Sequence, residues 1–307
     1  MTTMTIPVDH DNKRLDALWR RVASSKNQNT VMCHLGSSLY DGAPIIVLAT
    51  GLQRPSINGK TGDMLQIYIL RADMLPSEAV KIGADASICG TCKLRPMYRK
   101  LLGLEVECYV DKVRGPDGAM KSYQAGNCAT VTPEELGLMI ATLKQCGGPC
   151  AEDCEAPHTH KQTKCSSRKA CDRSGHAYKP LGVRDGAYGD PSFVDVSVWQ
   201  AIHKHHKGKR TSYSHDWQNR PDMASMSMAS IDKQTHPNTA EAIAEAKRLG
   251  FRWYRVLTAT DLPQQPDEIM CPEARPQSTI TCSDCGLCNG QRPNAKRSIG
   301  IVIPAIK

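Results

Sequence analysis

Aromatic residues are scarce in this 307-residue chain. They make up 5% of the sequence, and only Phe193 and Phe251 are phenylalanines. A core must therefore depend on Val, Ile, Leu, Met and Ala side chains, and metal sites would add to its stability. The shortage of aromatic rings also argues against a platform on which single-stranded nucleic acid stacks its bases.

The chain also lacks a long apolar run. The longest ones cover residues 44–49 and 299–306 and are too short to span a bilayer. The first 16 residues are polar and acidic and lack the apolar segment of a signal peptide. We therefore expect an intracellular, cytoplasmic protein with no membrane partner. In a reducing compartment its 14 cysteines are expected to bind metals and not to form disulfides.

A strong excess of one charge is missing as well. The net charge of +8 falls short of the balance typical of a dedicated nucleic-acid domain. Four basic runs nevertheless suit phosphate backbones, although a solvated surface that keeps the protein in solution is an alternative reading. These runs cover residues 93–100, 161–173, 203–210 and 292–297.

Four cysteines near the C-terminus form the most specific pattern, C-P-x9-C-x2-C-x2-C. They are Cys271, Cys282, Cys285 and Cys288. Tetrahedral zinc usually takes paired C-x2-C hooks from two separate segments. Three closely spaced cysteines plus a remote one followed by proline instead resemble the loops of ferredoxins. We expect an iron–sulfur cluster of the 4Fe–4S type here, ahead of zinc.

A second group consists of Cys89, Cys92, Cys108 and Cys128. The segment S-I-C-G-T-C-K is typical of a metal-ligand knuckle, because glycine allows the turn that exposes backbone N–H groups to sulfur. Cys108 is the expected third ligand, although a buried free cysteine in a strand is an alternative. Cys128 is the expected fourth ligand, and Cys33 could replace it. The spacing leaves iron–sulfur and zinc both open for this group.

Residues 146–175 are polar, lysine-rich and dense in cysteine and histidine. Cys150 and Cys154 begin the C-x3-C-x2-C pattern of radical-SAM loops, but Pro157 stands where the third cysteine belongs. The mixture of Cys and His therefore favours zinc. The candidate ligands are Cys146, Cys150, Cys154, His158, His160, Cys165 and Cys171.

The order of predicted elements indicates an α/β protein. Strands at 181–188, 210–215, 224–231 and 252–257 alternate with helices at 192–206 and 238–249. This alternation predicts a parallel β/α domain that forms a partial or complete barrel. The preceding part is expected to be mixed, with a helix at 15–22, strands at 45–50, 64–71 and 104–110, and a helix from 132 to about 145 that begins with a capping box. We expect a mixed part with the knuckle at 1–145, an insert at 146–175, the β/α domain at 176–260 and a cysteine-cluster segment at 261–307.

Polar residues follow the strands of the predicted β/α domain. Chemistry in parallel sheets gathers at the carboxyl ends of the strands, so these side chains are expected to share a pocket. The candidate catalytic residues are Asp190, His215, Asp216 and Asp232, and the candidate cofactor contacts are Tyr188 and Gly189. His215 could act as general base or metal ligand. For Asp190, capping of the next helix is an equally good explanation.

Two further motifs are not supported. The G-K-T at 59–61 has Arg54 where a phosphate loop requires glycine. The H-K-H-H at 203–206 falls in the last turn of a predicted helix, where cationic side chains complement the helix dipole.

The chain resembles an uncharacterised cysteine-rich family common in bacteriophage and prophage genomes. The resemblance depends on N-G-K-T-G-D-M at 58–64, S-I-C-G-T-C at 87–92, C-Y-V at 108–110, G-A-Y-G-D-P at 186–191, Y-S-H-D-W at 213–217, M-A-S at 228–230 and the C-terminal cysteine pattern. It implies a phage-like origin, a location in the host cytoplasm and metal dependence, but no reaction. The arrangement is also similar to radical-SAM-like barrels with auxiliary clusters, without their C-x3-C-x2-C.

Two functions remain open at this point. The first is an iron–sulfur protein with redox or radical chemistry on a nucleotide or nucleic acid, as an oxidoreductase or a nucleotide-modifying enzyme. The second is a non-catalytic module, held together by zinc, that binds nucleic acid or a host protein.

Overall fold

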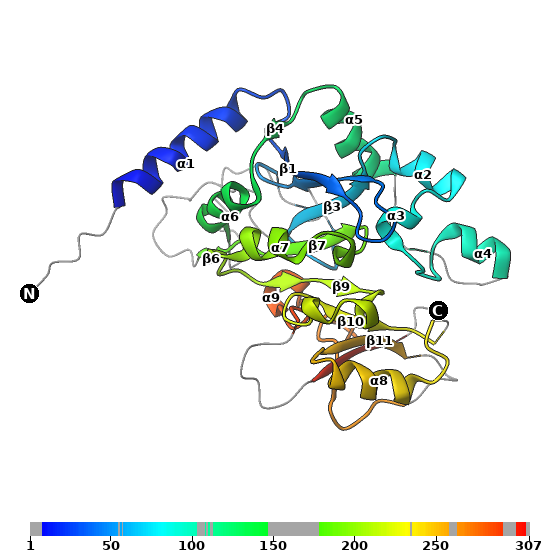
Figure 1. The fold of residues 1–307 in the computed structure, drawn as a ribbon. Coiled ribbons are helices and arrows are strands. Elements are labelled where there is room, and N and C mark those ends of the chain that lie inside the picture. Colours follow the sequence, from blue (N-terminus) through cyan, green and yellow to red (C-terminus); the bar gives the residue numbers. More distant parts are fainter. Residues whose placement is uncertain are drawn as a thin grey trace, which may run out of the picture.

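The computed structural model describes residues 8–54, 56, 58–102, 108, 110, 113–146, 178–233, 235–257, 263–290 and 299–304. The protein is a mixed α/β structure with one mixed sheet and one parallel sheet (Figure 1). The described helices are α1 (Val8–Ala23), α2 (Pro76–Ile82), α3 (Ala86–Cys89), α4 (Pro96–Leu102), α5 (Gly118–Gln124), α6 (Pro133–Thr142), α7 (Val196–His203), α8 (Thr239–Arg248) and α9 (Cys282–Cys285), with the short turns η1 (Val113–Asp117), η2 (Pro191–Phe193), η3 (Trp217–Asn219) and η4 (Pro221–Met223).

The described strands form two main sheets and one small antiparallel pair, β5 and β6. They are β1 (Thr30–Ser37), β2 (Pro44–Thr50), β3 (Leu65–Arg71), β4 (Ala129–Thr130), β5 (Lys144–Cys146), β6 (Tyr178–Pro180), β7 (Val183–Tyr188), β8 (Arg210–Thr211), β9 (Tyr213–Ser214), β10 (Met228–Ile231), β11 (Trp253–Leu257), β12 (Glu268–Met270) and β13 (Gly300–Pro304). The mixed sheet has the order β4-β1-β2-β3-β7-β8, and the parallel sheet has the order β12-β13-β11-β10-β9.

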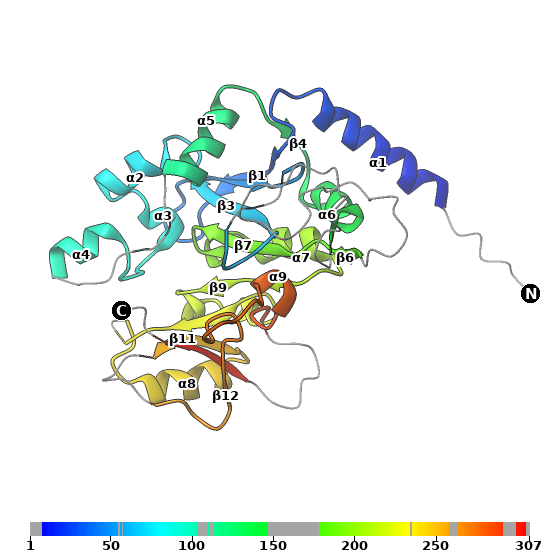
Figure 2. The same ribbon diagram turned by 180° about the vertical axis from the view of Figure 1, so that it is seen from behind.

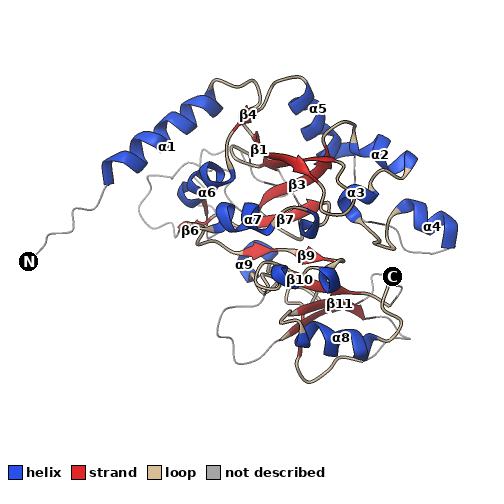
Figure 3. Ribbon diagram, viewed as in Figure 1, coloured by secondary structure: helices blue, strands red, loops and turns tan. Residues whose placement is uncertain are grey.

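One strand segment connects the two sheets. Only Ser212 separates β8 from β9, and its carbonyl accepts the Met228 N–H at 2.9 Å. Because β3, β7 and β8 are parallel, as are β9 to β13, the parallel strands follow one another across both sheets (Figure 3). The described strands form an open array, so the closed version of the predicted barrel is not confirmed.

The parallel sheet has two differently covered faces. Ala229, Ile231 and Trp253 belong to the main core together with residues of α8. Met228 and Ile301 alternate with them and form a smaller core with the tail cysteines. Viewed from behind, α9 lies against the strands of this sheet (Figure 2). The C-terminal cysteine segment therefore covers the face opposite to α8.

In the N-terminal sheet, α5 packs against β2 and α6 packs against β1, and α1 packs against α6. Thr132 caps α6 by accepting the Glu135 N–H at 3.2 Å, and the Glu135 carboxylate accepts the Thr132 N–H at 2.9 Å, which confirms the predicted capping box. Gly137 lets α6 approach α7 closely, since a Cβ there would lie 2.7 Å from the Ile202 carbonyl. No described helix is both long enough and apolar enough to cross a bilayer.

Several predicted boundaries need correction. The helix expected to reach 145 ends at Thr142, because Leu143 is extended and leads into β5. The strand expected at 224–231 begins only at Met228, after η4. The helix expected at 192–206 is a single α-helical segment, Val196–His203. Most of the strand expected at 104–110, and all of the insert after 146, lie outside the described residues.

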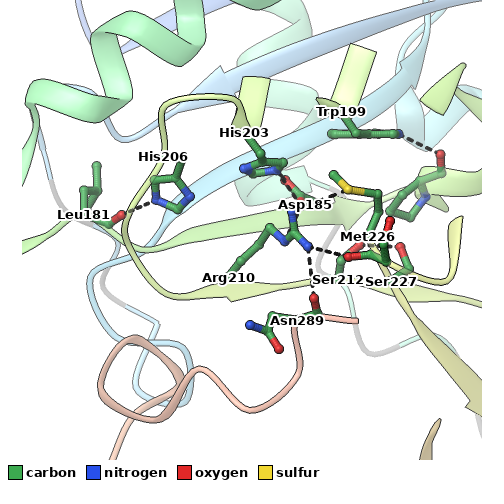
Figure 4. Close-up of polar contacts among 12 residues, drawn as sticks. Leu181, Asp185, Trp199, His203, His206, Arg210, Ser212, Met226, Ser227 and Asn289 are labelled. Carbon is green, nitrogen blue, oxygen red and sulfur yellow. Dashed lines mark hydrogen bonds and ion pairs between the residues drawn. The ribbon is translucent and has the colours of Figure 1, made fainter. Parts of the chain in front are cut away.

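A buried carboxylate connects β7 to the C-terminal half. Asp185 lies 3.0 and 2.9 Å, through its two oxygens, from Nε2 of His203, and Arg210 Nε lies 3.9 Å away (Figure 4). The Arg210 guanidinium also donates to the backbone oxygens of Ser225 and Asn289, at 3.0 and 2.9 Å. The basic run at 203–210 is therefore partly engaged in holding the fold.

His206 makes the stability of this region dependent on pH. Its Nε2–H donates to the Leu181 carbonyl at 2.7 Å, and burial lowers the pKa of His206 from 6.5 to about 4. In the unfolded chain the ring gains its proton near pH 6.5, so stability is complete above that pH and declines as the pH falls towards 4. We expect this group to remove up to about 3 kcal/mol from the free energy of unfolding.

A His206→Gln variant keeps an N–H donor for Leu181 but does not titrate. Urea unfolding at pH 7 and pH 4.5 should therefore show a smaller loss in the variant than in the wild type. An equal loss in both proteins would contradict this role of His206.

Candidate functional site: two cysteine groups on the parallel sheet

The four C-terminal cysteines line one pocket. Their lining partners include Lys60, Tyr213, Tyr254 and Ile301. Cys271 follows β12, and its N–H donates to the Val302 carbonyl at 2.8 Å. The other three cysteines come from α9 and the loop after it, where Gly286 ends the helix with a φ of 64°. The structure thus brings together all four residues of the predicted cluster motif.

The loop at residues 58–62 holds α9 in place. The N–H groups of Cys282 and Ser283 donate to the carbonyls of Lys60 and Thr61 at 3.0 and 3.1 Å. Gly62 has a φ of 67°, and a Cβ there would lie 2.6 Å from the Thr281 hydroxyl. The G-K-T segment at 59–61 therefore binds α9 and fixes the position of the C-terminal cysteine segment.

Burial and neighbouring cations have opposite effects on the pKa values of these thiols. Burial raises the pKa of Cys282 to about 11 and that of Cys288 to about 12. The neighbouring Tyr213 side chain partly opposes this rise in the pKa of Cys288, and Tyr213 packs against Tyr254 with ring centroids 4.8 Å apart. Four cations favour the thiolate forms of the cysteines: Lys60 and Arg184 act on Cys282, and Lys209 and Arg252 act on Cys285.

The second site lies at the carboxyl ends of β7, β9 and β10. Asp190 is buried there and accepts the N–H groups of Ser192 at 2.9 Å and His215 at 2.6 Å. Its own N–H donates to the Ile88 carbonyl at 2.6 Å, which brings the 89–92 knuckle to this edge. Both carboxylate oxygens of Asp190 are thus engaged in positioning the backbone.

His215 connects the predicted catalytic residues at this edge with the predicted metal knuckle. Its Nε2 lies 3.3 Å from the Ser230 hydroxyl and its Nδ1 lies 3.8 Å from Asp190, and the Cys92 side chain is close enough to affect its pKa. Burial alone would lower the pKa of His215, but Cys92, Asp190 and Asp232 raise it to about 9. The imidazole is therefore placed among anionic groups.

Several buried polar atoms at this edge have no hydrogen-bond partner among the described residues. Asp232 uses Oδ1 to accept the Thr235 N–H at 2.9 Å, whereas its Oδ2 is unpartnered. Both ring nitrogens of His236 are also unpartnered, as is the Tyr188 hydroxyl. Such atoms are costly to bury, and they mark a place where a polar ligand would be stabilised.

The remaining predicted residues have structural contacts. Asp216 accepts from the Asn219 side chain at 2.8 Å. Gly189 has a φ of 85°, and a Cβ there would lie 2.6 Å from the Ile69 carbonyl, so close packing on β3 accounts for the glycine.

Cys128 and Cys33 lie away from the knuckle. The Cys128 thiol donates to the Ser122 hydroxyl at 3.4 Å, between α5 and β4. Cys33 is buried in β1, and its thiol donates to the Val47 carbonyl at 3.5 Å. Neither contact brings these residues to Cys89 or Cys92.

In neither cysteine group do the side chains converge on a single metal position. Within the described ranges, no three His, Cys, Asp or Glu side chains converge closely enough to hold a metal ion. The pocket among the four C-terminal cysteines has a volume of about 20 Å³, roughly the space that one water requires. Any metal group at either site therefore requires the cysteine side chains to turn.

A larger cavity of about 580 Å³ lies apart from both cysteine groups. It is bounded by the start of β1, the end of β2 and α5, and its lining includes Lys26, Asn29, Gln53, Arg54 and Tyr68. Amide and cationic groups of this kind suit a polar, anionic ligand.

Sequence reasoning missed several residues of these sites. Arg95, Tyr213 and His236 were not singled out. Tyr213 packs against Tyr254, which is distant in the chain, whereas the partner of Arg95, Asp85, lies only 10 residues before it. The one available signal for Tyr213 was position, since β9 ends directly before His215.

Comparison of the chain with protein-family models, with curated proteins and with solved structures finds no match. The resemblance to the phage family therefore stays a prediction.

Proposed function

We propose that this protein is a phage-type iron–sulfur protein in which the four C-terminal cysteines hold a 4Fe–4S cluster. The observation that carries this proposal is that Cys271, Cys282, Cys285 and Cys288 line one pocket from two segments, the end of β12 and α9 with the loop after it. A cubane offers separate iron corners to such thiolates, whereas one zinc ion needs all four sulfurs about 2.3 Å from a single point. With one thiolate on each of its four iron atoms, the cluster would have no open iron for a substrate. It would therefore supply one-electron transfer.

The surroundings of the cysteines suit a group of net negative charge. Lys60 and Lys209 lie at the rim, and Arg252 fixes the loop by donating to the Leu287 carbonyl at 2.6 Å. Hydrogen bonds to sulfur and nearby cations raise the reduction potential of such a cluster.

The proposed substrate site is the carboxyl edge of the parallel strands, which would form the mouth of a partial barrel. Asp232 is the candidate acid or base, because its Oδ2 has no partner in the described part. Asp190 and Asp216 would act by positioning the loops. The proposed substrate is a nucleotide or nucleic acid, a class supported by the basic runs.

One observation favours a second candidate, the zinc-containing binding module. The cavity among the C-terminal thiols, about 20 Å³, suits a single ion better than a cluster. The visible spectrum of anaerobically purified protein separates the two. The iron–sulfur proposal predicts a brown protein with a band at roughly 400 nm that dithionite bleaches. A colourless, folded protein that contains only zinc would support the module instead.

A further inference from the structure

The knuckle at residues 89–92 is built as a rigid loop. The Cys92 N–H donates to the Cys89 carbonyl at 3.1 Å, and Gly90 takes a φ of 52° against the Phe193 ring. Arg95 donates to the Gly90 carbonyl at 2.8 Å, and the Arg95–Asp85 ion pair, at 2.7 Å, is almost fully buried. A buried ion pair adds little stability by itself, so its effect here is to fix the loop shape.

Two further donor groups reach this loop from distant parts of the chain. Cys108 is fastened beside it, since its N–H donates to the Leu94 carbonyl at 2.8 Å. His215 follows β9, and the Asp190 carboxylate accepts its backbone N–H at 2.6 Å. Asp190 also donates its own N–H to the Ile88 carbonyl, directly before Cys89, so it holds His215 next to the knuckle and close to Cys92.

We propose that Cys89, Cys92, Cys108 and His215 form a zinc centre that is separate from the C-terminal cluster. Three thiolates and one imidazole are a complete donor set for a closed, tetrahedral structural zinc site. Asp190 and Ser230 lie beside the His215 ring and would orient it, as partners in the outer shell commonly do.

The side chains must turn to close around the ion. Turning a side chain between rotamers costs little free energy, whereas a complete set of four ligands binds structural zinc strongly. Binding therefore outweighs the rearrangement by a wide margin. In this arrangement His215 is a ligand and not a general base, and Cys128 is not required.

Metal content of the full chain, purified without oxygen and exposed to EDTA, tests the proposal. We expect the same zinc content per chain in the wild type, in His215→Cys, which supplies a fourth thiolate, and in Cys128→Ser. His215→Gln should contain about one zinc fewer per chain, so zinc held by the insert at 146–175 does not affect the comparison. An unchanged zinc content in His215→Gln, or about one zinc fewer in Cys128→Ser, would overturn the proposal. Iron is measured in the same samples, so failure of the C-terminal cluster is seen separately.

Thiol labelling of the wild type keeps the test decisive if His215 variants do not fold. Cys89, Cys92 and Cys108 should react with iodoacetamide at least about tenfold more slowly before zinc is removed with a strong chelator than afterwards. Equal labelling rates in both states would show that the thiols hold no zinc and would overturn the proposal.

Discussion

A Cys285→Ala variant is expected to lose its iron and acid-labile sulfide. Cys285 lies on α9 with its thiol in the shared pocket, so its removal leaves one corner of the cluster without a ligand. Loss of an outer-shell partner already costs about 10–100-fold in metal affinity, and loss of a ligand costs more. Iron and sulfide analysis of anaerobic protein should give background values for both elements.

Cys128→Ser is the matched control for this loss. Cys128 is also a partly buried cysteine, but its thiol contacts Ser122 and lies away from the pocket. This variant should keep the iron and sulfide of the wild type. Wild-type iron in Cys285→Ala, or an equal loss in both variants, would show that the C-terminal thiols do not hold the cluster.

A Glu268→Gln variant is expected to lower the free energy of unfolding by about 3–5 kcal/mol. Glu268 and Arg255 have fully buried side chains and meet at 2.7 Å through both carboxylate oxygens. The carboxylate also accepts the Trp253 indole N–H at 2.7 Å and the Gln265 N–H at 2.8 Å. Replacing one partner leaves the guanidinium charge buried without compensation.

Asp267→Asn is the control, because Asp267 is adjacent in the chain but pairs with Lys247 at the surface. Exposed ion pairs contribute about 0–1 kcal/mol, so this change should be nearly neutral. The double variant Arg255→Met/Glu268→Leu should be more stable than either single charge deletion. Urea unfolding measures all of these changes. A loss below about 1 kcal/mol in Glu268→Gln would contradict the importance of this pair.

The grouping of the C-terminal cysteines could be predicted because much of its information is local. Three of them lie within seven residues, 282–288, two on α9 and one in the loop after it, although contacts to the loop at 58–62 also hold the helix. The fourth, Cys271, required only that its segment return to the same sheet. The two well-marked helices were predictable for the same reason, since Thr132 and Asn238 each accept an N–H within the first turn.

The partners at the carboxyl edge could not be predicted, because they depend on strand pairing. His215 comes close to Cys92 only after β8 pairs with β7, β9 continues from β8, and Asp190 bonds to both segments. Cys128 was expected at the knuckle from residue type alone, but α5 and β4 carry it to another part of the sheet. Short strands such as β12 contain too few residues to show the alternation of apolar and polar residues by which a strand is predicted.

The central claim is most directly tested by counting iron, sulfide and zinc per chain in wild-type protein kept free of oxygen. The account predicts about four iron and four sulfide from the C-terminal cluster and about one zinc from the knuckle centre. Protein that is folded but contains zinc without iron or sulfide would contradict it.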